Sequence, residues 1–236
     1  MPWGKEYCFL ERMETPLTFS EARVLGCLLE KATTTPDIYP LTVNSLLSAC
    51  NQRSNRDPVV EFDELTVKKA LDGLREKHLA VLVDQAGSRA SKFRHALHNL
   101  GDFEPAQEAL LCLLLLRGPQ TVGELRGRSE RLRPFATLAE VRNTLKSLQE
   151  SFDVPLIQEL PRQAGRKEVR FTHLLCGEPG IPEEGVADPA TGPYFPEAQP
   201  EISADEYQQL KQKVETLETE LRELQEKFES FRREFE

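Results

Sequence analysis

Residues 18–58, TFSEARVLGCLLEKATTTPDIYPLTVNSLLSACNQRSNRDP, decide the fold. Thr18 followed by Glu21 is a capping box, and apolar residues then recur at helical spacing, which predicts a helix. The run from Thr33 to Pro36 ends this helix, because β-branched residues and proline oppose its continuation. A second helix is predicted to begin near Thr42, and a long polar turn follows it.

Beyond this stretch the pattern changes from helices to strands. A third helix is predicted to begin near Asp63, and its apolar positions mark one buried face. Residues 79–83 and 92–97 then read as short strands around a turn at Gly87, which makes a β-hairpin. Three helices followed by a hairpin is the plan of a winged helix, so we predict a winged-helix domain over residues 15–100.

The same design returns in residues 101–177. Capping boxes at Thr121 and Thr137 mark two helices, and the apolar helix before them is expected to be buried on more than one side. Two further predicted strands align with the first hairpin at a constant shift, so that Phe93 matches Phe171. An internal repeat of this size indicates two copies of one domain.

The remaining residues predict an arm, a linker and a coiled coil. Residues 1–14 show no periodicity and are expected to form a disordered arm, and the proline-rich residues 178–202 are expected to form a linker. In residues 203–236 apolar side chains alternate between spacings of three and four, which is the seam of a coiled coil. We expect this helix to make a homo-oligomer, most simply a dimer, and the competing interpretation is a helix folded back onto the body. The oligomerisation residues are Leu210, Val214, Leu217, Leu221, Leu224, Phe228 and Phe231.

The complete pattern predicts a mainly α fold with small β-hairpin wings, built as two tandem winged-helix domains, a linker and a C-terminal coiled-coil helix. The motifs EARVLGCLLEK (residues 21–31), ACNQRSNRDPV (49–59) and LLLRGPQTVGELRGRSERL (114–132) resemble the signatures of the YceH-like family of bacterial proteins. The resemblance covers roughly residues 17–177. It implies two winged-helix domains with a heptad-like tail, and it implies no particular activity.

Composition and charge describe a globular chain with an acidic tail. The formal net charge is −9, and residues 177–236 hold 6 Lys and Arg against 16 Asp and Glu. The body is therefore close to neutral, and the acidic total does not exclude nucleic-acid binding by the body. Five isolated cysteines without a CxxC pair indicate reduced thiols in a cytoplasmic protein. The pattern predicts neither a membrane span nor a signal peptide.

The sequence contains no constellation typical of an enzyme. It lacks a glycine-rich phosphate loop, a nucleophile elbow and an HExxH motif. His95 and His98 have no Cys, Asp or Glu partner at metal-ligand spacing. His95 and His173 occupy equivalent positions of the two copies, which favours a packing role over a shared active site. We therefore expect no catalytic residue, no cofactor and no bound metal.

Double-stranded DNA is the partner that a winged helix most naturally binds, because its third helix fits the major groove. In the second copy, basic and amide side chains gather before the third helix, along it and at the wing tip. Such groups pair well with phosphates and guanine edges. The alternative is a solvated face in which Glu124, Glu130 and Glu140 neutralise the arginines. The candidate DNA-binding residues are Arg126, Arg128, Arg131, Arg133, Arg142, Asn143, Lys146, Arg166 and Lys167.

The first copy is predicted to be the poorer DNA reader. Glu61, Asp63 and Glu64 stand at the start of its third helix, where carboxylates repel phosphates. Arg53 and Arg56 in the polar turn are candidate contacts for a partner. We therefore expect a DNA-binding, transcription-regulator-like protein, and the alternative is a protein-interaction scaffold that does not bind DNA.

Overall fold

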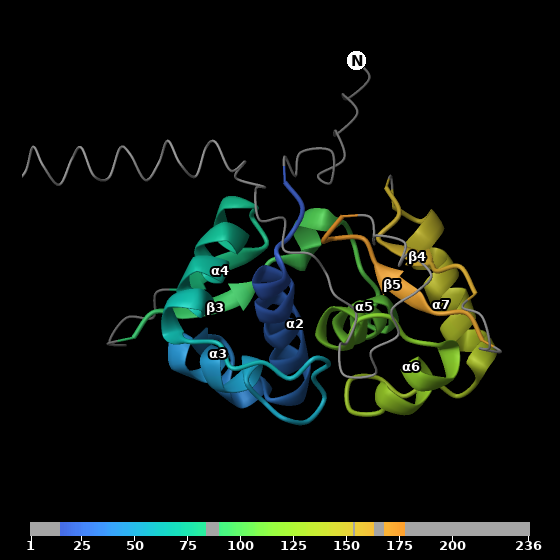
Figure 1. Ribbon diagram of the computed structural model, residues 1–236, viewed down its shortest axis with the longest axis horizontal. Coiled ribbons are helices and arrows are strands. Elements are labelled where there is room, and N and C mark those ends of the chain that lie inside the picture. Colours follow the sequence, from blue (N-terminus) through green and yellow to red (C-terminus); the bar gives the residue numbers. More distant parts are fainter. Residues whose placement is uncertain (1–14, 84–89, 153, 163–167, 178–236) are drawn as a thin grey trace, which may run out of the picture. The chain divides into compact units, whose positions relative to one another are not determined.

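The computed structural model describes residues 15–83, 90–152, 154–162 and 168–177. Within these residues the chain is mainly helical and carries two small antiparallel sheets (Figure 1). The predicted arm, linker and coiled coil lie outside them, as do the turns of both predicted hairpins.

The first half of the described fold opens with three helices and closes with a hairpin. Its helices begin where the sequence predicts, because Thr18, Thr42 and Asp63 each accept a hydrogen bond from the backbone N–H three residues on. The elements are α2 (Phe19–Thr34), the short 3-10 helix η1 (Pro36–Ile38), β1 (Leu41–Thr42), α3 (Val43–Cys50), α4 (Glu64–Glu76), β2 (Ala80–Val83), β3 (Lys92–His95) and η2 (Leu97–Leu100).

The second half repeats the order of three α-helices followed by a hairpin. Pro105 is the first residue of its first helix, and Gly118 ends that helix with a φ of 64°, a conformation that favours glycine. Thr121 and Thr137 cap the next two helices. The elements are α5 (Pro105–Arg117), α6 (Val122–Arg128), α7 (Leu138–Glu150), β4 (Ile157–Glu159) and β5 (Phe171–His173).

The two sheets repeat one pairing pattern. In the first hairpin β2 pairs with β3, and Leu41 of β1 pairs with Phe93 on the other edge of β3. In the second hairpin β4 pairs with β5, and Gln120 pairs with Phe171 of β5. In both halves the residue before a helix-capping threonine is therefore tied to the second strand of the hairpin. The observed strands are shorter than the sequence predicts.

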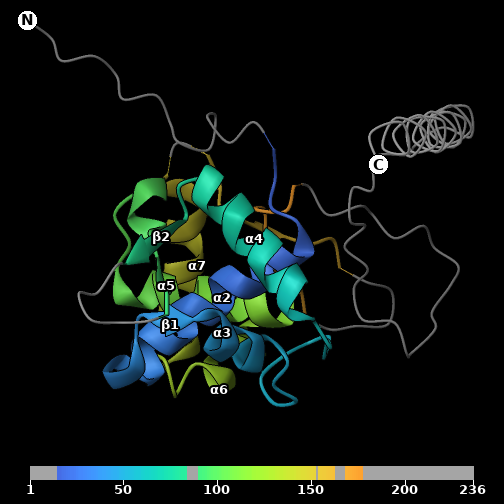
Figure 2. The same cartoon turned by 90° about the vertical axis from the view of Figure 1, so that its left-hand side faces the viewer.

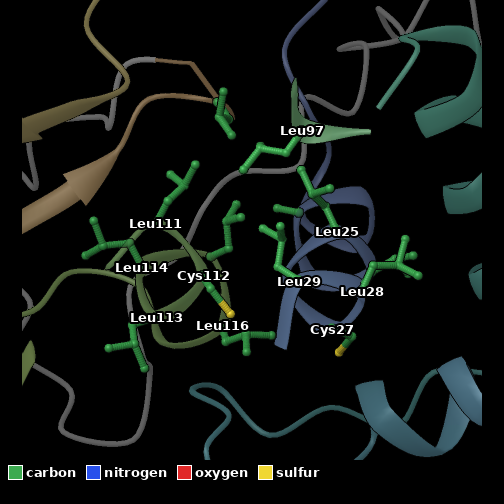
Figure 3. Packing of buried hydrophobic residues seen from close by; sticks show 14 of the residues in the cluster. Leu25, Cys27, Leu28, Leu29, Leu97, Leu111, Cys112, Leu113, Leu114 and Leu116 are labelled. Atoms are coloured by element: carbon green, nitrogen blue, oxygen red, sulfur yellow. The ribbon is translucent and has the colours of Figure 1, made fainter. Parts of the chain in front are cut away.

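Helices α2 and α5 lie side by side and join the two halves (Figure 1). Leu25 and Leu29 of α2 face the leucines of α5, and Cys112 lies between the two helices (Figure 3). Gly26 permits this approach, because a Cβ added there would lie 2.8 Å from Cδ2 of Leu116. One buried hydrophobic cluster therefore continues from the first half into the second.

Helices α4 and α7 each bury one apolar face against this core. Figure 2 shows α4 lying across α2, with which it packs. The predicted buried stripes are confirmed, since their main residues are at most 1% exposed: Val67, Leu71 and Leu74 on α4, and Val141, Leu145 and Leu148 on α7. The opposite face of each helix is exposed to solvent.

Candidate nucleic-acid interface

The exposed face of α7 carries the basic and amide residues predicted for this helix. Arg142, Asn143 and Lys146 are exposed, on the side opposite to the buried stripe. The Lys146 ammonium lies 3.8 Å from Glu150, but these side chains are 68% and 64% exposed, so water screens their attraction. The face therefore presents its positive charge to solvent.

Two of the predicted arginines fix the turn between α6 and α7. Arg126 donates hydrogen bonds to the carbonyls of Phe135 (3.3 Å) and Ala136 (2.9 Å). Arg133 lies 2.8 Å from Glu140, and its guanidinium stands 5.0 Å from the centre of the Phe135 ring. Hydrogen bonds from Arg133 and from the Ala136 N–H lower the pKa of Glu140. These contacts hold the chain where it enters α7.

The other two arginines of this run bind groups outside the turn. Arg128 donates to the side-chain oxygens of Gln120 at 2.9 Å and Glu124 at 3.5 Å. Arg131 donates to Glu30 of α2 at 2.6 Å, although its own side chain is 46% exposed. Three of the four arginines thus pair with a carboxylate, as expected for a face in which nearby acids neutralise the arginines. The acid that pairs with Arg131 is Glu30, which is not one of the acids predicted for this role.

The remaining candidates of the second copy have no described position. Arg166 and Lys167, at the predicted wing tip, lie outside the described residues. The oligomerisation residues of the predicted coiled coil also lie outside them. The described part of the candidate interface therefore consists of the end of α6, the turn after it and α7.

Helix α4 presents a face of mixed charge. Glu64 pairs with Lys68, and Asp72 pairs with Arg75, all with exposed side chains. The Asp63 carboxylate caps the helix, and hydrogen bonds from Thr66 lower the pKa of Asp63. Opposite charges therefore alternate along the exposed face of α4.

The two arginines of the polar turn in the first half differ in burial. Arg53 is exposed and stays a candidate contact for a partner. Arg56 is buried, with a side chain 0% exposed and Nη2 at 2.6 Å from Glu30. It also donates to the Ala49 carbonyl at 3.0 Å. The prediction that Arg56 contacts a partner is wrong. Its guanidinium is buried and paired inside the fold, where it holds the turn in place.

Two charged residues of α2, which the sequence does not predict as site residues, lie in the core. Arg23 is 0% exposed and donates to the carbonyls of Cys50 and Pro58. Glu30 is 1% exposed, and hydrogen bonds from Arg56 and Arg131 outweigh its burial, so that its pKa lies below the ordinary value. The spacing in the sequence carries a signal for this placement, because residues 23, 27 and 30 lie on one face of a helix.

The histidines that repeat between the two copies are held neutral. Burial lowers the pKa of His173 to about 4, and burial together with His98 and Arg94 lowers that of His95 to about 4. The His95 backbone N–H donates to the Tyr39 hydroxyl at 2.7 Å. Across the described ranges no group of three or more His, Cys, Asp or Glu side chains is arranged to hold a metal ion.

No helix among residues 15–177 that the structure describes combines the length and apolar character needed to cross a membrane.

Comparison with known proteins identifies a bacterial family. A family model described as protein of unknown function, DUF480, matches residues 17–166. A UPF0502 protein of Geobacter sulfurreducens is 53% identical over 180 residues, which cover 76% of this chain and 81% of the relative. A UPF0502 protein of Pectobacterium carotovorum is 42% identical over 218 residues, covering 90% and 96%. The predicted resemblance to a YceH-like bacterial family is consistent with these matches.

Proposed function

This chain belongs to the family described as protein of unknown function DUF480, and on that premise we propose that it is a cytoplasmic, transcription-regulator-like protein that binds double-stranded DNA. Two tandem winged-helix domains, residues 15–100 and 101–177, carry the proposed function. Helix α7 of the second domain enters the major groove.

The repeated order of elements supports the tandem winged-helix interpretation. Each half has three α-helices followed by a two-stranded hairpin. In each half the hairpin also accepts one further pairing, from the residue before a capping threonine. A shared plan with shared pairing favours two copies of one domain over an accidental similarity of helix order.

The exposed face of α7 is the observation that carries the proposal. Arg142, Asn143 and Lys146 lie together on it, and Arg126 and Arg131 are exposed in the segment just before it. An arginine guanidinium pairs with phosphates or guanine edges, an asparagine reads adenine edges, and a lysine ammonium neutralises phosphate. The contacts of Arg126 and Arg133 within the turn hold α7 in position for such readout.

The dependence of DNA affinity on salt tests the proposal. Fluorescence anisotropy would measure the affinity of the full chain for random and genomic duplexes at several salt concentrations. Arg142→Ala with Lys146→Ala should flatten the slope of log affinity against log salt by about 2, one unit for each phosphate that is no longer neutralised. Lys68→Ala with Lys69→Ala, on the exposed face of α4, is the matched control and should leave the slope unchanged.

The arginine run before α7 gives a second measurement at this site. Arg126→Ala and Arg131→Ala remove exposed cations, and we expect them to lower the salt slope further. Arg128 and Arg133 are each about one-third exposed, and all four arginines contact other parts of the fold, so circular dichroism would establish that each variant is folded. If the salt slope is unchanged in every variant, the second domain does not hold the DNA interface.

A protein-interaction scaffold is the second candidate function. Exposed apolar side chains favour it, because Ile38, Val59 and Leu65 of the first half are 61%, 52% and 58% exposed. Arg53 lies in the same half and is exposed. Absence of DNA binding by the full chain at low salt would favour this candidate over the regulator.

The proposed assembly is a homodimer through the coiled-coil helix of residues 203–236. Nine apolar side chains at heptad spacing, from Tyr207 to Phe235, support a partner helix for this segment. Light scattering would compare the full chain with a chain that ends at Pro200. A dimer that becomes a monomer on truncation supports the proposal, and a monomeric full chain at micromolar concentration contradicts it.

A further inference from the structure

A buried polar cluster lies between α2, α3 and the turn after α3, and its residue Glu30 binds Arg131 of the proposed DNA-binding segment. Three of its residues, Arg23, Cys27 and Glu30, come from one face of α2. Cys50 ends α3, and Arg56 comes from the turn. Each of the five is at most 4% exposed. Figure 3 shows Cys27 on α2, in the segment that also carries Leu28 and Leu29.

This cluster holds more positive than negative charge. Arg23 and Arg56 are both buried, and Glu30 is the carboxylate buried with them. Glu30 is also shared with two cations from outside the cluster, Arg131 at 2.6 Å and Lys31 at 3.7 Å. A buried guanidinium without a counter-charge is strongly unfavourable, so a further negative group beside Arg23 would stabilise the cluster.

Arg23 shows where that charge is missing. Its guanidinium donates to the backbone carbonyls of Cys50 at 3.4 Å and Pro58 at 2.7 Å, and its buried Nε has no hydrogen-bond acceptor. Burial is the main effect that lowers the pKa of Arg23. Asp57 attracts this guanidinium, but Asp57 is exposed to water, where its charge is screened.

Cys27 is placed to supply the negative charge. Its Sγ accepts a hydrogen bond from Nη2 of Arg56 at 3.5 Å. Burial and Glu30 disfavour its ionised form, but the neighbouring Cys50 thiol and the charges of Arg56 and Arg23 outweigh them, so the pKa of Cys27 is lowered. The same interaction raises the pKa of Cys50, which therefore remains a thiol.

The third buried thiol of this region does not take that role. Cys112 of α5 donates to the carbonyl of Gly26 at 3.4 Å. Burial, with further contributions from Glu30 and Cys27, raises the pKa of Cys112. Cys112 is therefore a neutral neighbour of Cys27 and a natural control for it.

We propose that Cys27 is a buried thiolate that balances the charges of Arg23 and Arg56, and that Cys27 and Cys50 form a peroxide-sensitive dithiol. This assigns a modification site to the first half of the chain, and a hydroperoxide is the class of oxidant that it takes. The assignment does not depend on DNA binding.

Oxidation of this dithiol proceeds in two steps. The Cys27 thiolate attacks one oxygen of hydrogen peroxide, the O–O bond breaks, a sulfenic acid forms on Cys27 and hydroxide leaves. The Cys50 sulfur then attacks the sulfenic sulfur, so that the S–S bond forms and the S–O bond breaks. The leaving hydroxyl takes the Cys50 proton and departs as water. Two sulfur atoms are oxidised, and one peroxide is reduced by two electrons.

The turn after α3 controls access to Cys27. Arg56 and Pro58 of this turn bind the α2 cluster, so opening the turn admits the oxidant. A disulfide removes the thiolate charge and leaves Arg23 and Arg56 with Glu30 alone. The oxidised protein therefore holds the turn less tightly, and the Arg53–Arg56 peptide region becomes more open to protease.

Ultraviolet thiolate absorbance tests the charge state. In the full chain with Cys8→Ser and Cys176→Ser, the remaining thiols are the three buried ones, at positions 27, 50 and 112. We expect about one thiolate per folded chain at pH 7, and about a tenth of that after unfolding in denaturant, where each of the three thiols is about 3% ionised. Adding Cys112→Ala should leave the signal, and adding Cys27→Ala should abolish it. If the folded parent protein shows no thiolate at pH 7, the proposal is overturned, whether or not the variants fold.

Mass spectrometry after peroxide treatment tests the dithiol. The parent protein should lose two hydrogens, and peptide mapping should find the Cys27–Cys50 disulfide. With Cys50→Ala the product should instead gain one oxygen on Cys27, and with Cys112→Ala the disulfide should form as in the parent. Circular dichroism would establish that each variant is folded. A parent that resists peroxide, or that bridges Cys27 to Cys112, overturns the assignment.

Discussion

Glu30 and Arg131 lie 2.6 Å apart, and their ion pair joins α2 of the first half to the turn before α7 in the second. The carboxylate is 1% exposed, and its second oxygen holds Arg56 at 2.6 Å. Glu30 therefore holds together two segments that lie far apart in the sequence. Its two partners differ greatly in burial, which separates their expected contributions to stability.

Removing the buried partner should cost far more than removing the exposed one. Arg56→Ala leaves Glu30 in the core with a partly hydrated partner, and we expect the free energy of unfolding to fall by about 3–5 kcal/mol. Arg131→Ala removes a side chain that is 46% exposed, and we expect a loss of at most about 1 kcal/mol. Urea denaturation measures both. Equal losses would show that burial does not decide the strength of these pairs.

The close approach of α2 and α5 predicts a steric effect at Gly26. Gly26→Ala would place a methyl group 2.8 Å from Leu116 in a packed interior, which should lower the unfolding free energy by about 1–3 kcal/mol. Leu116→Val in the same chain should recover part of this loss. Gly127→Ala in α6 is the matched control, because no atom lies within 4 Å of its added Cβ. That change should be neutral or stabilise by up to about 1 kcal/mol.

The buried stripes of α4 and α7 predict equivalent losses in the two halves. Leu71→Ala and Leu145→Ala, each at a position 1% exposed, should each lower the unfolding free energy by about 2–5 kcal/mol. Leu65→Ala and Leu138→Ala, at positions 58% and 40% exposed on the same helices, should change it by less than about 0.5 kcal/mol. Denaturant melting measures these changes. An unchanged unfolding free energy for Leu71→Ala or Leu145→Ala would show that the buried stripe is wrongly placed.

The buried histidine of β5 predicts loss of stability in acid. His173 has a pKa of about 4 in the fold, whereas an unfolded histidine titrates near 6.5. Between these values the unfolded chain binds more protons, so stability is complete above about pH 6.5 and declines as the pH falls toward 4. One such histidine contributes a slope of about 1.4 kcal/mol per pH unit.

Urea denaturation at several pH values between 7 and 4 checks this prediction. His173→Gln should reduce the slope in that window, while His95 maintains the remaining dependence because its pKa is also about 4. An identical slope in the variant and in the unchanged protein would contradict a neutral, buried His173.

Helix starts and buried faces could be predicted because both depend on local spacing. The capping boxes at Thr18 and Thr121 form with both of their reciprocal hydrogen bonds. At Thr137 only one forms, since the Glu140 carboxylate binds Arg133 and the Ala136 N–H instead of returning to the cap. The exception arises from a contact outside the four-residue box, which local spacing does not contain.

The partners of the arginines could not be predicted in the same way. Residues 126–133 pass from a helix into a turn, where no period determines which way a side chain points. The partner of Arg131 is 101 residues away in the sequence, and Arg56 reaches Glu30 across 26. Both pairings follow from the packing of α2 against its neighbours, which composition and charge counts do not show.

The shared α2–α5 core predicts how the described body responds to heat. Two domains that kept separate surfaces would unfold independently, each at its own temperature. Here Gly26 of the first half admits Leu116 of the second, and the leucines of α5 are buried on every side. Because each half forms part of the other's interior, we expect both halves to melt in one cooperative transition.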